Sequence, residues 1–276
     1  MPIFALLLKD SGAALCQRMR KFGFRAWLLV VCNMPGILHA QPASPWNGVG
    51  VTPKLESHHV AACTACHGPQ GRATPSGYFP RLAGKPQEYL YQQLLNFRDG
   101  RRSYPLMGHL LRHLDNDQLQ GMAQYFAQLR IPYPSPEPVT STSASLERGA
   151  QLIRQGDVSR GLPACTACHG GQLMGVLPAV PGLLGLSRDY LNSQLGAWKV
   201  GRRSAKSPDC MAQIAQKLLP QDVADITAWL TAQTVPIEAA AESQETRRWP
   251  MACGAAPQHD AVAPDSTIDA SGKESS

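Results

Sequence analysis

The chain lacks the features that mark several large protein classes. Charged residues make up only 17% of its 276 residues, and a formal net charge of +6 is too small to indicate a nucleic-acid-binding protein. Eight cysteines are too few for a disulfide-dense scaffold of this length. Alternating β-branched runs are scarce, and beyond the N-terminal region no apolar segment approaches the roughly 20 residues of a membrane-spanning helix. The remaining pattern, with 43% hydrophobic residues, is that of a globular helical chain.

The first forty residues have the pattern of an export signal. Basic residues between Arg18 and Arg25 precede the mainly apolar stretch 26–38, and polar, Pro-containing sequence follows Ala40. We therefore predict that residues 1–40 are a signal peptide, with Met19 as a candidate true start. The mature protein is expected in the periplasm, soluble or peripherally attached to the membrane. An uncleaved N-terminal anchor is the alternative interpretation.

The sequence contains an internal repeat. Cys63-Thr-Ala-Cys66-His67-Gly68 recurs as Cys165-Thr-Ala-Cys168-His169-Gly170, at an offset of 102 residues. Further matches follow at an offset of 101, including the pairs Arg101-Arg102 and Arg202-Arg203, and then at 104, where Met107 matches Met211. Small drifts between long matches are what loop insertions produce, so the pattern indicates a tandem duplication.

The repeat defines the domain boundaries. We predict one domain at 41–130 and a second at 146–236. The segment between them, 131–145, is Pro-rich and then Ser/Thr-rich, which is typical of an extended spacer. The tail, 237–276, carries three basic and seven acidic residues without sustained periodicity, and is expected to be mostly disordered.

Within each repeat the patterns predict helices. An apolar stripe runs over 86–97 and stops near Gly100, Asp115 is a candidate N-cap, and Pro220 suits a first helical position. The predicted fold class is therefore all-α, with two tandem helical domains.

The motif Cys-x-x-Cys-His is typical of c-type haem attachment. Its two cysteines can form thioethers with one haem, and the adjacent His67 or His169 can bind the iron as proximal ligand. A redox pair or half of a zinc site are alternatives for a bare Cys-x-x-Cys, but neither repeat supplies a second Cys pair. Two copies in duplicated domains of an exported chain favour two covalently bound haem c groups. The attachment residues are Cys63, Cys66, Cys165 and Cys168.

The sixth iron position has candidates in both repeats. Methionine thioether ligation is typical of electron-transfer cytochromes, and Met107 and Met211 are the methionines that align between the repeats. Competing residues either lack a suitable counterpart or suit a core position: Met122, Met174, His109 and His113. The sequence favours Met107 for the first iron and Met211 for the second.

On these motifs the chain resembles dihaem cytochromes of the c4 type, which have two class I cytochrome c domains in tandem. The resemblance covers roughly residues 54–233 and implies one haem wrapped by each domain, with the haems close enough for internal electron transfer. It also implies a carrier in a respiratory chain, with a quinol-oxidising complex as donor and a terminal oxidase or reductase as acceptor. We expect no catalysis of bond chemistry and no nucleic-acid partner.

Several features depart from the family pattern. The segment before Cys63 is short, so the first helix is expected to be reduced, and Gly171-Gln-Leu-Met174 replaces the usual turn after the second motif. Cys210 directly precedes Met211; it could pair with Cys253, but a free, partly buried cysteine is the favoured interpretation. The two Arg pairs could contact haem propionates or steer an acidic partner, whereas a solvated helix end is favoured for at least one Arg of each pair.

Two further functions remain open at this point. The chain could be the dedicated cytochrome subunit of a periplasmic dehydrogenase. It could instead be a dihaem peroxidase, which requires an open or displaceable position on one iron. The paired methionines argue against the peroxidase.

Overall fold

A computed structural model of the chain describes residues 60–236, 240–243 and 248–256. The predicted signal peptide at 1–40, its candidate start Met19 and the residues ahead of Val60 lie outside the described residues, as does the rest of the tail. Over the described part, no helix combines the length and the apolar character that a membrane crossing requires.

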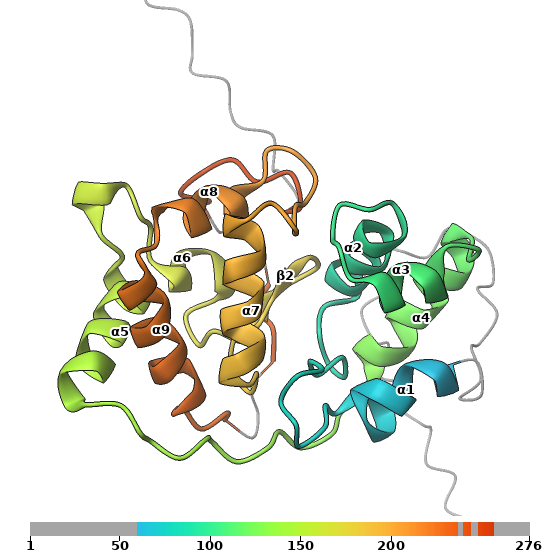
Figure 1. The fold of residues 1–276 in the computed structure, drawn as a ribbon, viewed down its shortest axis with the longest axis horizontal. Coiled ribbons are helices and arrows are strands. Elements are labelled where there is room, and N and C mark those ends of the chain that lie inside the picture. The colour runs from blue at the N-terminus through green and yellow to red at the C-terminus, as the bar shows by residue number, and fades with distance from the viewer. Residues whose placement is uncertain (1–59, 237–239, 244–247, 257–276) are drawn as a thin grey trace, which may run out of the picture. The chain divides into compact units, whose positions relative to one another are not determined.

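The first domain consists of helices around a small core (Figure 1). Its elements are α1 (Ala61–His67), a 3₁₀ turn at Pro69–Gly71, α2 (Gln87–Arg98), α3 (Pro105–Leu111) and α4 (Asn116–Gln128). Helices α2 and α4 pack against each other. One cluster of buried residues in this domain consists of Val60, Leu90, Ala123 and Phe126.

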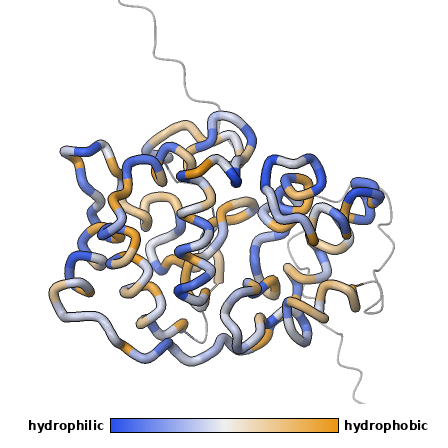
Figure 2. Tube along the Cα trace, viewed as in Figure 1, coloured by the Kyte–Doolittle hydropathy of each residue, from blue (hydrophilic) through white to orange (hydrophobic). Residues whose placement is uncertain are grey.

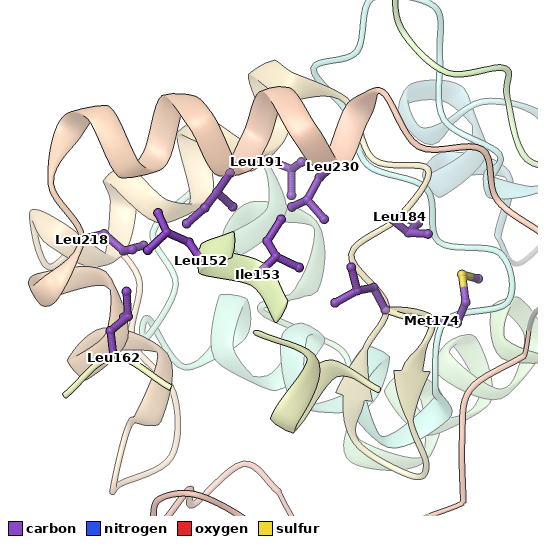
Figure 3. Packing of buried hydrophobic residues seen from close by; sticks show 10 residues of the cluster. Leu152, Ile153, Leu162, Met174, Leu184, Leu191, Leu218 and Leu230 are labelled. Carbon is purple, nitrogen blue, oxygen red and sulfur yellow. The ribbon is translucent and has the colours of Figure 1, made fainter. Parts of the chain in front are cut away.

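The second domain repeats this plan with additions. Its elements are α5 (Ser143–Gln155), a 3₁₀ turn at Val158–Arg160, α6 (Cys165–His169), β1 (Gly175–Val176), β2 (Val180–Pro181), α7 (Arg188–Lys199), α8 (Cys210–Lys217) and α9 (Pro220–Thr231). Helices α5 and α9 lie side by side (Figure 1). Figure 3 shows Leu152 and Ile153 pointing into the same cluster as Leu191 and Leu230. The prediction of an all-α fold is confirmed in its main elements.

The helix boundaries follow local sequence signals. Helix α2 occupies the predicted stripe and ends just before Gly100, whose φ is +80°. Asp115 caps α4 as predicted: its carboxylate accepts from Gln118 N at 2.8 Å, and the Gln118 side chain accepts from Asp115 N at 3.0 Å. Pro220 begins α9. Hydrophilic and hydrophobic stretches alternate along the same helices (Figure 2), as helices with one buried face require.

The second domain adds a two-stranded antiparallel hairpin that the sequence patterns did not predict. Gly175 pairs with Pro181, and Val176 pairs with Val180. The hairpin falls in the segment after the second motif, where the sequence departs from the first repeat. Two residues per strand are too short for an alternating pattern to show in the sequence.

The described parts of the tail, residues 240–243 and 248–256, make specific contacts and so differ from the predicted disorder. Glu242 N donates to Gly175 O at 2.9 Å, and Leu177 N donates to Glu242 O at 2.8 Å, so this segment pairs with β1. Ala256 is buried. These backbone bonds supply partners that the composition of the tail does not reveal.

The prediction of a free Cys210 is wrong. Cys210 and Cys253 form a disulfide, with Cα atoms 4.9 Å apart. The two residues are 43 positions apart in sequence, so only the return of the tail to α8 brings them together.

Residues 131–142 between the domains contain no helix or strand, and α5 begins at Ser143, so this helix includes the last residues of the predicted spacer. The spacer also contacts the protein. The Arg81 guanidinium donates to Pro132 O at 2.9 Å and lies 4.0 Å from the Tyr133 ring centroid, and Glu137 N donates to Thr231 O at 2.9 Å. The spacer therefore joins elements of both domains by specific contacts.

Candidate functional site

The two repeated motifs occupy equivalent short helices. Each motif histidine ends its helix, His67 in α1 and His169 in α6. His67 Nδ1 lies 2.9 Å from Pro80 O, and His169 Nδ1 lies 2.7 Å from Pro181 O. A carbonyl oxygen only accepts, so Nδ1 carries the proton in both rings and Nε2 keeps its lone pair for a metal.

Burial keeps both imidazoles neutral. It is the largest cause that lowers the pKa of His67 and of His169, against the opposing effect of the carbonyl hydrogen bonds. Both rings are more than nine-tenths buried. Neutral, oriented imidazoles are the form that binds iron.

None of the four motif cysteines takes part in a disulfide, so their sulfurs are available for thioether bonds: Cys63, Cys66, Cys165 and Cys168. Burial raises the pKa of the Cys63 thiol and raises that of Cys165 to about 12. The Cys63 and Cys165 sulfurs are therefore not thiolate nucleophiles of the redox-catalyst kind, whose pKa is lowered. No group of three or more His, Cys, Asp or Glu side chains placed to hold a metal ion occurs among residues 60–236, 240–243 and 248–256.

The two aligned methionines lie on equivalent helices. Met107 is in the first turn of α3, and Met211 is in the first turn of α8. Of the competing residues in the first domain, His109 is exposed, His113 accepts from Arg112 Nε at 2.8 Å, and Met122 packs against the core. Met174 is buried in the core of the second domain (Figure 3).

All eight predicted site residues line one cavity of about 770 Å³. They are Cys63, Cys66, His67 and Met107 from the first domain and Cys165, Cys168, His169 and Met211 from the second. The rest of the lining is mainly apolar and includes Leu90, Phe126, Leu152 and Ile226. The structure thus brings both sets of predicted residues to a continuous apolar space.

A polar network at the contact between the domains borders this cavity. Arg102 donates to Gln93 Oε1 at 3.0 Å and to Gln194 Oε1 at 2.5 Å, and Arg203 donates to the same two oxygens at 3.0 Å and 2.8 Å. Each glutamine therefore accepts from the arginines of both domains. Arg102 also donates to the Tyr190 hydroxyl at 3.0 Å.

The backbones beside the network pair reciprocally. Ser103 N donates to Arg202 O at 2.8 Å, and Ser204 N donates to Arg101 O at 2.7 Å. Sequence reasoning missed the glutamines, although Gln93 and Gln194 match at the same offset of 101 as their neighbours.

The two arginines of each pair have different environments. Arg102 and Arg203 are buried and lie over aromatic rings, 4.4 Å from the Phe97 centroid and 3.8 Å from the Trp198 centroid. Burial, followed by the charge of Arg102, lowers the pKa of Arg203. Arg202 is exposed, and Arg101 is partly exposed with an ion pair to Asp99 at 3.0 Å. The solvated position expected for one Arg of each pair is therefore present.

Lys85 is a buried cation that sequence reasoning also missed. Its ammonium donates to Gly182 O at 2.9 Å, next to Pro181, whose carbonyl accepts from His169. Burial, with the charge of Arg81 second, lowers the pKa of Lys85 to about 7. The equivalent residue of the second repeat is Leu186, which has no side-chain donor. The second domain therefore makes no reciprocal bond of this kind to the first at this position.

The cavity and its polar donors match both the apolar macrocycle and the acidic propionates of a haem. A macrocycle needs an apolar space, and its propionates need cations or N–H donors. Within the described residues neither Arg102 nor Arg203 has a carboxylate partner, and the buried Trp198 indole N–H has no hydrogen-bond partner. All three line the cavity. The donor set thus fits the acidic edge of a haem.

A helical chain with two such sites is a c-type cytochrome. The sequence model of the cytochrome c family matches residues 57–130. The chain is 35% identical to a "Thiosulfate dehydrogenase electron acceptor" of Thiomonas intermedia over 78% of its own length and 94% of the relative, and 34% identical to a "Cytochrome c4" of Pseudomonas aeruginosa over 62% and 83%. The crystal structure of reduced cytochrome c4 from Pseudomonas stutzeri superposes with a TM-score of 0.56 at 30% identity, over 64% of this chain and 96% of that one.

The chain belongs to the family of dihaem cytochromes of the c4 type. It carries two covalently bound haem c groups and is an electron-transfer protein, as the sequence predicted. The relatives are named as electron-transfer cytochromes and electron acceptors, and this confirms the prediction that the chain is a carrier and not a catalyst.

Proposed function

We propose that each repeat holds its haem by the residues that the sequence singled out. Cys63 and Cys66 form the thioethers of the first haem with His67 and Met107 as iron ligands, and Cys165 and Cys168 form those of the second with His169 and Met211. One observation carries this proposal: all eight side chains line one cavity whose remaining surface is mainly apolar.

The protein residues hold the haems in a state suited to electron transfer. When bound, each haem supplies a one-electron iron couple. The carbonyls of Pro80 and Pro181 orient the two imidazoles through Nδ1. The thioethers of Met107 and Met211 would complete the ligand set of each iron and raise its reduction potential, which disfavours the peroxidase alternative.

We also propose that the domain contact is the route of internal transfer. Both haem sites open to the same cavity, and the arginine–glutamine network crosses from one domain to the other at its edge. Arg102 and Arg203 then balance the propionate charges in a place from which water is largely excluded.

The ligation is tested on the dihaem protein with single variants. Met107→Ala and Met211→Ala should each remove one methionine–iron charge-transfer band and lower the potential of one haem, while the mass still shows two haems. A spectrum that is unchanged in either variant contradicts the assignment of that methionine. A mature mass equal to residues 41–276 plus two haems would also support the signal peptide and a periplasmic location.

The donor is the finer part of the proposal. The similarity to a thiosulfate dehydrogenase electron acceptor extends over 94% of that relative, which favours a periplasmic dehydrogenase of that class as donor. Under this proposal the chain is the cytochrome partner of the dehydrogenase, and it passes electrons on to a terminal oxidase or reductase.

The comparison that tests the donor uses two reductants in parallel. The oxidised protein should be reduced rapidly by thiosulfate with a purified thiosulfate dehydrogenase, and slowly by a quinol-oxidising complex with its quinol. The reverse order of rates would instead support the quinol-oxidising donor that the family resemblance implies.

A further inference from the structure

The tail segment 248–256 is fixed to the second domain at one place. The Cys210–Cys253 disulfide joins it to the start of α8, and Gly254 N donates to Pro208 O at 2.8 Å. The backbone there is so close that a Cβ on Gly254 would clash with Ser207 O. We call residues 248–256 the tethered segment.

The tethered segment forms part of the wall of the haem cavity. Trp249, Met251, Cys253, Ala255 and Ala256 all line the cavity that Met211 lines. The Trp249 indole N–H is buried without a hydrogen-bond partner in the described structure. A buried donor and apolar side chains at a cavity wall indicate that this segment contacts what fills the cavity.

The disulfide lies beside the proposed iron ligand. Cys210 is the first residue of α8, and Met211 follows it directly. Asp209 caps the helix, accepting from Ala212 N at 3.0 Å and from Ala205 N at 2.7 Å. The first turn of α8, which contains Met211, is therefore held both by the cap and by the covalent link.

The first domain has no such link at the equivalent place. Leu106 occupies the position of Cys210, and its side chain is 46% exposed. Leu110 and Tyr78 nearby are also exposed. The two repeats thus match in their proposed ligands but differ in what covers the helix that carries the methionine, α3 or α8.

We propose that the tethered segment is a cover that positions Met211 and closes the distal side of the second haem pocket to external ligands. This rests on the proposed ligation by Met211. Because a covalent link limits how far the start of α8 can move, Met211 would stay close to the iron after leaving it and would rebind before a competitor does. Opening the link takes two electrons and two protons, for example from a dithiol that becomes a cyclic disulfide while Cys210 and Cys253 become thiols.

The test compares the two haems within one protein. Imidazole is titrated into the oxidised full-length dihaem protein, and loss of each methionine–iron bond is followed by spectroscopy, with Met107→Ala and Met211→Ala assigning the signals. In the variant Cys210→Ala/Cys253→Ala, the affinity of the second haem for imidazole should rise at least tenfold. The affinity of the first haem should stay the same.

A shortened chain and a matched variant complete the test. A protein that ends after Ser243 keeps the pairing of Glu242 with β1 and should reproduce the rise at the second haem. Leu106→Ala, at the equivalent place in the first domain, should leave the second haem unaffected. Equal imidazole affinities of the second haem in the wild type and in both tether variants would overturn the proposal, as would an equal rise at both haems.

The experiments distinguish a failure of the proposed Met211 ligation from a failure of the proposed cover. An unchanged methionine–iron band in Met211→Ala contradicts the ligation alone. Imidazole access to the second haem, measured in the tether variants, still decides whether the tethered segment closes the pocket.

Discussion

At the scale of single residues, Asp222 shows how the second domain holds a buried charge. Its carboxylate accepts from Arg148 at 2.5 Å, from Arg160 at 2.6 Å and from Leu219 N at 2.8 Å. Burial alone would raise the pKa of Asp222, but the hydrogen bonds from Arg160, Leu219 N and Arg148 together lower it. The charged form is therefore the stable form in the folded domain.

The first prediction concerns Asp222→Asn. The free energy of unfolding should fall by about 2–3 kcal/mol, less than for a fully buried ion pair because both arginines are partly exposed. Because the folded pKa is lowered, the contribution of Asp222 is present above its unfolded pKa and is lost as the pH falls below it. Chemical denaturation at pH 7 and at low pH measures both effects, with the exposed Asp189→Asn as control. An equal loss in the two variants would contradict this role.

The second prediction concerns Lys85. Its pKa is about 7 in the folded protein against 10.5 for an ordinary lysine. Between these two pH values the unfolded chain binds more protons than the folded protein, so the free energy of unfolding rises with pH. Below the folded pKa both states are protonated at Lys85, so this residue causes no further change of the free energy of unfolding with pH. Lys85→Met should remove this rise, whereas Met at the exposed Lys206 should keep it. Denaturation curves at several pH values between 7 and 10 provide the measurement, and identical slopes in all three proteins would refute the expectation.

At the scale of elements, Gly149 allows α5 and α9 to approach closely. A Cβ at this position would clash with Asp225 O and lie 3.0 Å from Trp229 Cβ. Both of those residues are in α9, which packs along α5. The glycine is therefore required by the neighbouring helix.

The third prediction follows from this close approach. Gly149→Ala should destabilise the protein by about 1–3 kcal/mol, because the two helices must move apart. Gly196→Ala in α7 is the matched control, since a Cβ there meets no atom within 4 Å. That change should stabilise the helix by up to about 1 kcal/mol. Thermal unfolding of both variants measures the difference, and two shifts of the same sign would be the contradicting result.

Helices could be predicted from the sequence wherever the determining residues lie within the element. Asp115 and Gln118 cap α4 from three positions apart, and Pro220 starts α9 by its own geometry. The hairpin could not be predicted because its strands have only two residues each, and its pairing with Glu242 could not be predicted because it depends on a return of the chain over a long distance.

The same limit applied to the site. The duplication pointed to the eight predicted site residues, all of which line the cavity, because each motif had a copy to compare with. Lys85 and Cys253 have no copy, and their roles depend on partners from distant segments, Gly182 and Cys210. These two features differ between the repeats, so the duplication gave no second copy from which to predict them.

At the scale of the whole molecule, the arginine–glutamine network links the two domains. The fourth prediction is that Arg102→Ala/Arg203→Ala loosens this contact, since Gln93 and Gln194 lose their charged donors and the propionates lose their partners. Calorimetry should then show two separate unfolding transitions, and electron exchange between the haems should slow. The exposed Arg202→Ala serves as control. A single transition in the double variant, with unchanged exchange, would show that other contacts hold the domains.

The reciprocal backbone bonds between the two arginine segments have a consequence for the symmetry of the molecule. Ser103 bonds to Arg202 as Ser204 bonds to Arg101, so each repeat presents the same surface to the other. A surface that recognises its own copy is isologous, and such surfaces build symmetric homodimers. The contact therefore has the symmetry of a homodimer although it lies within one chain, and the covalent connection makes the encounter of the two halves independent of concentration. The two halves need not be identical away from this contact, and they differ where Cys210 precedes Met211 and Leu106 precedes Met107.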